Sequence, residues 1–294
     1  MARQIWPVLM SVALGPLCVP SQILADGLIF SLPPDGTWVE YVGSGQYRCE
    51  FSVPEDVLKR MDPAGKAQME ALSRPQELQE TIRVSSVGVD KYAERGCRWI
   101  ELRSSSKRIS SGSQEEHPNP IYLLKMLIPE KYLNRGNDPL DNAVLTFFNP
   151  KDSDRAKVAP EPGFDRIRYE IERFIPRCPP PLEDETRLDN ETIETAIGTF
   201  RDCEVIRGTS QFDRPLSNDG RWEGKSTWII ALHPDAPFGV VRLGTESTVN
   251  EVHTGSAVKS QSTREYKIAA KGADATTELP EGKRDSISAI TRPK

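Results

Sequence analysis

The sequence predicts an α+β protein that is mostly β and is dominated by an antiparallel sheet. Several segments alternate apolar and polar residues with a period of two, the pattern of half-buried antiparallel strands. The 24 prolines and 20 glycines are spread along the 294 residues and divide the chain into many short elements. Helical spacing of apolar residues is scarce, so we expect only short helices.

The clearest strand is residues 47–53, in which every odd position is apolar. Residues 37–42 alternate in the same way, and Gly43-Ser44-Gly45 between the two segments predicts a hairpin turn. The following segment, residues 82–89, changes phase at Ser85-Ser86, which predicts a β-bulge. Further strands are expected at 97–103, 121–128, 144–148, 167–171, 193–206 with a break near Gly198, 226–232, 238–243 and 263–269.

Two regions have the spacing of short helices. Apolar residues recur at helical intervals over 55–72, and Pro63 predicts that this helix is split. Residues 130–140 predict one or two further turns. Between them, the serine-rich residues 104–118 are expected to form a mobile loop.

Residues 1–25 have the pattern of a cleavable secretory signal peptide. Arg3 supplies the positive charge, and residues 5–17 form an apolar run that is too short to span a bilayer as a helix. We expect cleavage after Ala25, with Ser21 as the alternative position. The chain is therefore predicted to be periplasmic or secreted.

The remaining residues are expected to form a single domain over 26–270 and a disordered tail over 271–294. The tail is polar and nearly free of aromatic residues. Hydrophobic residues make up 37% of the chain and its net charge is −5. This balance argues against nucleic acid as a partner, since that function favours a clustered basic surface.

Four cysteines follow the predicted signal peptide: Cys49, Cys97, Cys178 and Cys203. An even number in an exported chain predicts two disulfides, with three possible connectivities. Proximity of the predicted strands favours the pairs Cys49–Cys97 and Cys178–Cys203. No Cys-x-x-Cys spacing is present and the three histidines have no metal-ligand spacing, so we expect no metal site.

Sequence patterns that resemble catalytic sites lack the context that the chemistry needs. Ser104–Lys107 and Ser256–Lys259 match the Ser-x-x-Lys spacing of serine acylases, but neither pair lies in a helical pattern. Gly220–Ser226 is one residue short of a phosphate-binding loop. The acidic residues 183–185 predict solvated surface rather than a calcium site. We therefore expect no cofactor and no enzymatic activity.

Six short motifs occur in a recognisable order: Gly36–Tyr41, Cys97–Leu102, Leu123–Pro129, Ala196–Cys203, Trp228 and Ala236–Val241. This succession resembles a group of exported bacterial proteins related to the lipoprotein-carrier (LolA-like) superfamily. The resemblance implies a curved antiparallel sheet, an unclosed half-barrel with one or two short helices on its concave side. Members hold acyl chains or lipidated proteins in an apolar hollow and are not enzymes. Long insertions at 54–80 and 104–118 depart from the pattern.

Aromatic side chains are the candidates to line such a hollow, although they also suit an ordinary core. The candidate residues are Trp38, Phe51, Trp99, Tyr169, Phe200 and Trp228. We expect a binding or carrier protein for an apolar ligand, lipid or lipidated peptide, peripheral to the membrane at most. The alternative is an envelope scaffold with a solid core that contacts a protein partner.

Overall fold

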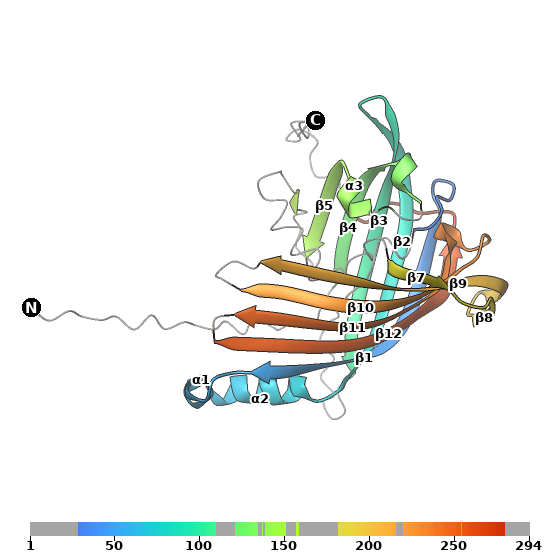
Figure 1. Cartoon of the computed structure of the whole chain (residues 1–294). Coiled ribbons are helices and arrows are strands. Elements are labelled where there is room, and N and C mark those ends of the chain that lie inside the picture. The colour runs from blue at the N-terminus through green and yellow to red at the C-terminus, as the bar shows by residue number, and fades with distance from the viewer. Residues whose placement is uncertain are drawn as a thin grey trace, which may run out of the picture.

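The computed structural model describes residues 29–109, 121–134, 137, 139–150, 157–158, 182–215, 220–253 and 255–279. Within them the chain is mostly β, as predicted (Figure 1). The predicted signal peptide, the strand expected at 167–171 and the cysteine at position 178 lie outside the described residues. No helix in the described part of the chain is long and apolar enough to cross a membrane.

All described strands belong to antiparallel pairs in one extended arrangement with the order β6-β5-β4-β3-β2-β1-β12-β11-β10-β9-β7, and β8 pairs with β9 beside it. This order ends in different strands at its two edges, so the sheet is not closed. The strands are β1 (Trp38–Ser52), β2 (Gln76–Tyr92), β3 (Arg95–Ile109), β4 (Ile121–Pro129), β5 (Leu145–Pro150), β6 (Lys157–Val158), β7 (Glu183–Arg187), β8 (Glu191–Thr195), β9 (Gly198–Pro215), β10 (Arg221–Leu232), β11 (Val240–His253) and β12 (Ser256–Gly272).

The helices are short, and all but η4 fall in or next to the two regions predicted to be helical. They are α1 (Glu55–Arg60), α2 (Pro63–Ser73), α3 (Pro139–Asn142) and the 3-10 turns η2 (Glu130–Tyr132) and η4 (Pro237–Gly239). The split between α1 and α2 is confirmed: Asp62 caps α2 by accepting a hydrogen bond from the Gly65 amide at 2.6 Å. Leu72 of α2 packs against Tyr47 and Leu78.

The sheet has two faces that differ in composition. One face, called here the buried face, carries the main hydrophobic cluster, which joins residues of β1–β4 to residues of β9–β12. On the other, the exposed face, most side chains at the alternate positions are polar or charged and half-buried or exposed, with apolar exceptions such as Val42, Ile229 and the buried Ala231. Successive side chains of a strand point to opposite faces, so Ile229 lies on the exposed face and Ile230 on the buried face.

The hairpin predicted at Gly43-Ser44-Gly45 is wrong, because β1 runs unbroken through it. Both glycines pair with β12, and both are needed for close packing rather than for a turn. A Cβ at Gly43 would lie 2.2 Å from the Tyr266 ring, and one at Gly45 would lie 2.1 Å from the Thr263 carbonyl oxygen. In contrast, the predicted bulge in β2 is confirmed by a register shift between Ser86 and Val89.

Several strands extend beyond their predicted bounds. β3 continues to Ile109, into the segment expected to be a loop, because residues 104–109 pair with β2. Most residues there are Ser, Lys and Arg rather than apolar, so hydrophobic alternation does not predict this part of the strand. β11 and β12 also continue through polar residues to His253 and from Ser256.

The segment after β12 differs from the predicted tail in its first residues. Residues 273–279 lie against the exposed face, where the Trp38 indole donates to Asp274 at 2.7 Å. The buried carboxylate of Glu101 accepts from the Thr277 hydroxyl at 2.7 Å and from the Glu278 amide at 2.8 Å. These specific polar contacts order a stretch whose composition alone predicts disorder.

The predicted Cys49–Cys97 disulfide is wrong, since both thiols are free and buried. β1 pairs with β2 and β12, not with β3, and the two cysteines lie toward opposite ends of β2. The Cys49 sulfur lies 2.7 Å from the Tyr47 hydroxyl instead. Cys203 is also a free, buried thiol, so the structure does not contain its predicted bridge.

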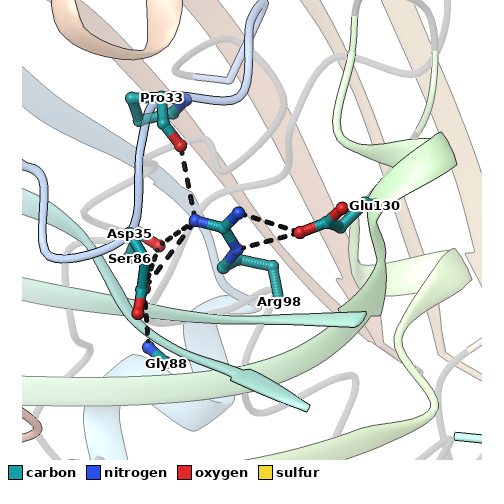
Figure 2. A network of polar contacts seen from close by, with 6 residues as sticks. All are labelled: Pro33, Asp35, Ser86, Gly88, Arg98 and Glu130. Carbon is teal, nitrogen blue, oxygen red and sulfur yellow. Dashed lines mark hydrogen bonds and ion pairs between the residues drawn. The ribbon is translucent and has the colours of Figure 1, made fainter. Parts of the chain in front are cut away.

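A polar network fixes the segment before β1 to the sheet (Figure 2). Arg98 of β3 donates from Nε and Nη2 to one oxygen of Glu130 at 3.1 and 2.8 Å. Its Nη1 donates to the Ser86 hydroxyl at 3.0 Å and to the Pro33 carbonyl at 3.4 Å. Asp35 accepts from the same serine at 2.8 Å. These contacts hold the chain that leads from the buried Ile29 into β1.

Candidate functional site

The aromatic residues predicted to line one hollow lie on both faces of the sheet. Phe200 and Trp228 belong to the main hydrophobic cluster, Trp228 on the buried face, and Phe51 packs beside the smaller cluster next to α2. Trp38 and Trp99 lie on the exposed face, and Tyr169 lies outside the described residues. The structure therefore does not bring this set together.

The two tryptophans on the exposed face are each paired with a cation. The Arg83 guanidinium lies 3.9 Å from the centre of the Trp38 ring, and the Lys125 ammonium lies 5.1 Å from that of Trp99. The segment 273–279 contacts Trp38 and Lys125 as well. These aromatic rings contribute to holding that segment.

The buried face is not apolar throughout. Four serines stand directly opposite one another on β9, β10, β11 and β12: Ser210, Ser226, Ser247 and Ser262. All are buried, and their hydroxyls form internal hydrogen bonds such as Ser226–Ser247 at 2.8 Å and that from the Trp228 indole to Ser210 at 2.8 Å. This row divides the apolar surface of β9–β12, so it does not form one continuous apolar lining.

Two hollows of ligand size lie on the exposed face. One, of about 460 Å³, lies over β9–β12 and β1, and a second, of about 550 Å³, lies over β12 and β1–β3. They meet at Ser44 and Glu265, which line both. We call the first the exposed-face hollow; its volume falls in the usual range of small-molecule sites.

Small side chains on neighbouring strands form the floor of the exposed-face hollow. Gly244 of β11 stands between Ile229 of β10 and Glu265 of β12, and Ser44 of β1 follows Glu265 in the same row. A Cβ at Gly244 would meet its nearest neighbour at 3.7 Å, which is an ordinary contact. The space above Gly244 is therefore open, and its glycine is not demanded by packing.

Beneath the floor lies a buried ion pair. The Arg264 Nε lies 3.0 Å from a carboxylate oxygen of Glu80, and the Tyr266 hydroxyl donates to the same oxygen. Burial raises the pKa of Tyr266 well above its ordinary value, and the charge of Glu80 adds to the rise. Gly43 and Gly45 leave the room that Tyr266 and Arg264 need.

Charged side chains surround the exposed-face hollow. Arg207 and Arg242 contribute positive charge, and Glu246 and Glu265 contribute negative charge. Arg242 forms a 2.8 Å ion pair with Glu191 of β8. Arg207 and Glu246 form no ion pair or hydrogen bond within the described residues. The hollow thus offers one unpaired charge of each sign.

The hollows also expose apolar surface. Ile229 is 36% exposed in the exposed-face hollow, and Val42 is 50% exposed in the neighbouring one. A third, smaller space of about 340 Å³ lies between Val42 and the turn that joins β8 to β9. This arrangement suits reversible binding of a ligand that has both polar and apolar parts.

None of these residues is predicted from the sequence, because none belongs to a motif or a strong hydrophobic pattern. Gly244 resembles an ordinary strand glycine, and Arg207 and Glu246 resemble solvated surface. Their grouping arises only from the pairing of β9, β10 and β11. The detectable signal was the alternation of Thr227, Ile229 and Ala231 with large buried residues. Within the described residues, no group of His, Cys, Asp and Glu could hold a metal ion.

Comparisons with known proteins leave the family open. No known protein family and no curated protein matches the chain. Among solved structures it matches the S-type phycobiliprotein lyase CPES from Guillardia theta, at 10% identity and a TM-score of 0.25, over 80% of this chain and 87% of that one. A likeness at this TM-score supports no inference about ligand or reaction.

One prediction is nevertheless corrected. The sequence predicts a protein without enzymatic activity, and this prediction is withdrawn: the absence of a recognisable catalytic pattern does not exclude an enzyme, and the matched structure carries the name of a lyase. The comparisons do not single out the lipoprotein-carrier superfamily, so that resemblance stays a prediction.

Proposed function

We propose that this chain is an exported binding protein of the cell envelope that holds a small amphipathic ligand in the exposed-face hollow. The observation that supports the proposal is the open space of about 460 Å³ above Gly244, on a floor of small side chains. Ile229 supplies apolar contact, and the surrounding threonines and charged groups supply polar contact. The ligand is therefore amphipathic rather than wholly apolar.

A carried lipid or lipidated peptide would therefore bind on the exposed face, and not in an apolar hollow lined by aromatic residues. Large side chains and a hydrogen-bonded serine row occupy the buried face, which leaves the exposed face as the better surface. Export remains part of the proposal and depends on the pattern of residues 1–25. Sequencing the amino terminus of protein recovered from the periplasm or medium tests it: a start at Asp26 supports export, and an intact Arg3 contradicts it.

Occlusion of the exposed-face hollow tests the binding role. Gly244→Leu places a side chain in the open space without a close contact at Cβ, so the fold is retained. Thr248→Leu is the matched control, because Thr248 lies on the same face of β11 but does not line the hollow. Each protein is incubated with small-molecule extract of the producing cells and examined by native mass spectrometry.

We expect a bound ligand in the parent and in Thr248→Leu and its loss in Gly244→Leu. Equal occupancy of all three proteins, or no bound ligand in any of them, contradicts the proposal. Circular dichroism spectra that match the parent establish that Gly244→Leu is folded.

A solid scaffold remains the second candidate. The observation that favours it is the packing of β1–β4 with β9–β12 residues into one cluster of fully buried side chains. Crosslinking in cells distinguishes the two: a scaffold is recovered with one protein partner whether or not Gly244 is replaced by leucine.

A further inference from the structure

The unpaired charges of the exposed-face hollow indicate the class of its ligand. Arg207 and Glu246 both line the hollow, and neither forms an ion pair or hydrogen bond within the described residues. The other charged residues differ in this respect: Arg242 pairs with Glu191 at 2.8 Å, and Glu265 lies 3.8 Å from Lys267. One cation and one anion are therefore available to a ligand.

The strand register places these two charges apart. Arg207 stands opposite Ile229, and Ile229 stands opposite Gly244, two residues from Glu246. Two strand spacings and a two-residue step separate their Cα atoms by about 12 Å. The two long side chains shorten this gap but do not close it to an ion pair. A ligand that spans it needs opposite charges at its two ends.

The surface between the charges is apolar or small. Ile229 and the methyl group of Thr227 lie between β9 and β11, and Gly244 leaves space beside them. A short hydrocarbon spacer fits this surface. A purely anionic ligand would approach Glu246 and Glu265, and a purely cationic one would approach Arg207 and Arg242, so like-charge repulsion disfavours both.

We propose that the exposed-face hollow binds a zwitterion, with its anionic group at Arg207, its cationic group at Glu246 and an apolar spacer over Ile229. This inference rests on the proposed binding function and names the ligand class. Charge-assisted hydrogen bonds at both ends give the selectivity. The neighbouring arginine and glutamate, Arg242 and Glu265, add long-range attraction at the corresponding ends.

Three probes of equal length test the inference: 6-aminohexanoic acid carries both charges, hexanoic acid only the negative one and hexylamine only the positive one. Their affinities are measured by NMR titration of the whole chain. We expect 6-aminohexanoic acid to bind at least about tenfold more tightly than either analogue, since a lost charge-assisted contact exceeds a factor of ten.

Two variants assign the ends of the ligand. Arg207→Gln is expected to lower the affinity for 6-aminohexanoic acid to that for hexylamine, while the affinity for hexylamine stays unchanged. Glu246→Gln is expected to lower the affinity for 6-aminohexanoic acid to that for hexanoic acid. Lys225→Gln is the matched control, because this exposed lysine lies on the same face of β10 but does not line the hollow.

The inference is overturned if an analogue with one charge binds as tightly as the zwitterion, or if none of the probes binds. It is also overturned if neither variant changes the relative affinities of the three probes. In the last case the Gly244→Leu experiment separates the two proposals. A cellular ligand that is lost in Gly244→Leu leaves the binding function in place and removes only the zwitterion. If no such cellular ligand is found, both proposals are contradicted.

Discussion

Individual glycines and tyrosines determine how closely β1 and β12 pack. Gly43 and Gly45 stand directly opposite Tyr266 and Arg264, and the ring and the guanidinium stem occupy the space that a Cβ would take. Gly244, in contrast, has room for a side chain. The same residue type therefore has a packing role at two positions and leaves a binding space at the third.

Substitution of these glycines by alanine separates the two roles. Gly43→Ala is expected to lower the free energy of unfolding by about 1–3 kcal/mol, because Tyr266 must leave its position. Gly244→Ala is expected to change it by less than about 1 kcal/mol. Urea unfolding measures both; an equal loss in the two variants would show that the packing around Gly43 is not as described.

Burial raises the pKa of both Tyr41 and Tyr266. A raised pKa in the folded state means that the stabilising contribution is complete below the unfolded value of about 10 and declines as the pH rises above it. We therefore predict that these two of the seven tyrosines ionise only when the protein unfolds in alkali. Absorbance at 295 nm checks this.

The control for the alkaline titration is Tyr266→Phe, which should reduce the late step by one tyrosine. Ionisation of all tyrosines near pH 10 with an unchanged far-UV spectrum would contradict the described burial.

At the scale of elements, the buried carboxylate of Glu101 makes the largest number of the hydrogen bonds that hold the segment 273–279 to the exposed face. Glu101 accepts hydrogen bonds from Thr277, from the Glu278 amide and, at 3.4 Å, from the Leu279 amide. Arg103 lies 3.3 Å from Glu278 as well. The segment therefore depends on polar contacts from β3 more than on its own composition.

Glu101→Gln tests this dependence. The amide nitrogen of glutamine cannot accept a hydrogen bond, so we expect reduced exchange protection at Glu278 and Leu279 and a loss of about 1–3 kcal/mol in the free energy of unfolding. Hydrogen exchange followed by mass spectrometry measures the protection, with the exposed Glu70→Gln as control. Unchanged protection would mean that Glu101 does not hold the segment.

At the scale of the whole molecule, the sequence predicts the fold class and most strands because apolar alternation follows burial. Residues 121–128 are an example, since Tyr122, Leu124 and Met126 of β4 are all buried. The prediction fails where contacts between distant segments determine the local structure. At Gly43, for example, the neighbour that excludes a Cβ is Tyr266. The prediction of a loop at 104–109 fails for a related reason, since these polar residues pair with β2 and extend β3.

The candidate site was less predictable than the fold. The aromatic candidates lie on both faces of the sheet, whereas glycine, serine and threonine residues form much of the exposed-face hollow. Arg207 and Glu246 are almost forty residues apart in the sequence and come to line one hollow only when β9, β10 and β11 pair. Register, which sets these neighbours, cannot be read from composition or periodicity in a single sequence.

The central claim is that ligand binds on the exposed face, and two consecutive residues of β10 test it most directly. Ile229 lines the exposed-face hollow, and Ile230 is fully buried on the opposite face. In methyl-labelled protein titrated with 6-aminohexanoic acid or with cell extract, we predict saturable chemical-shift changes at Ile229 and none of comparable size at Ile230. Changes centred on Ile230, with Ile229 unaffected, would place the ligand on the buried face and contradict the account.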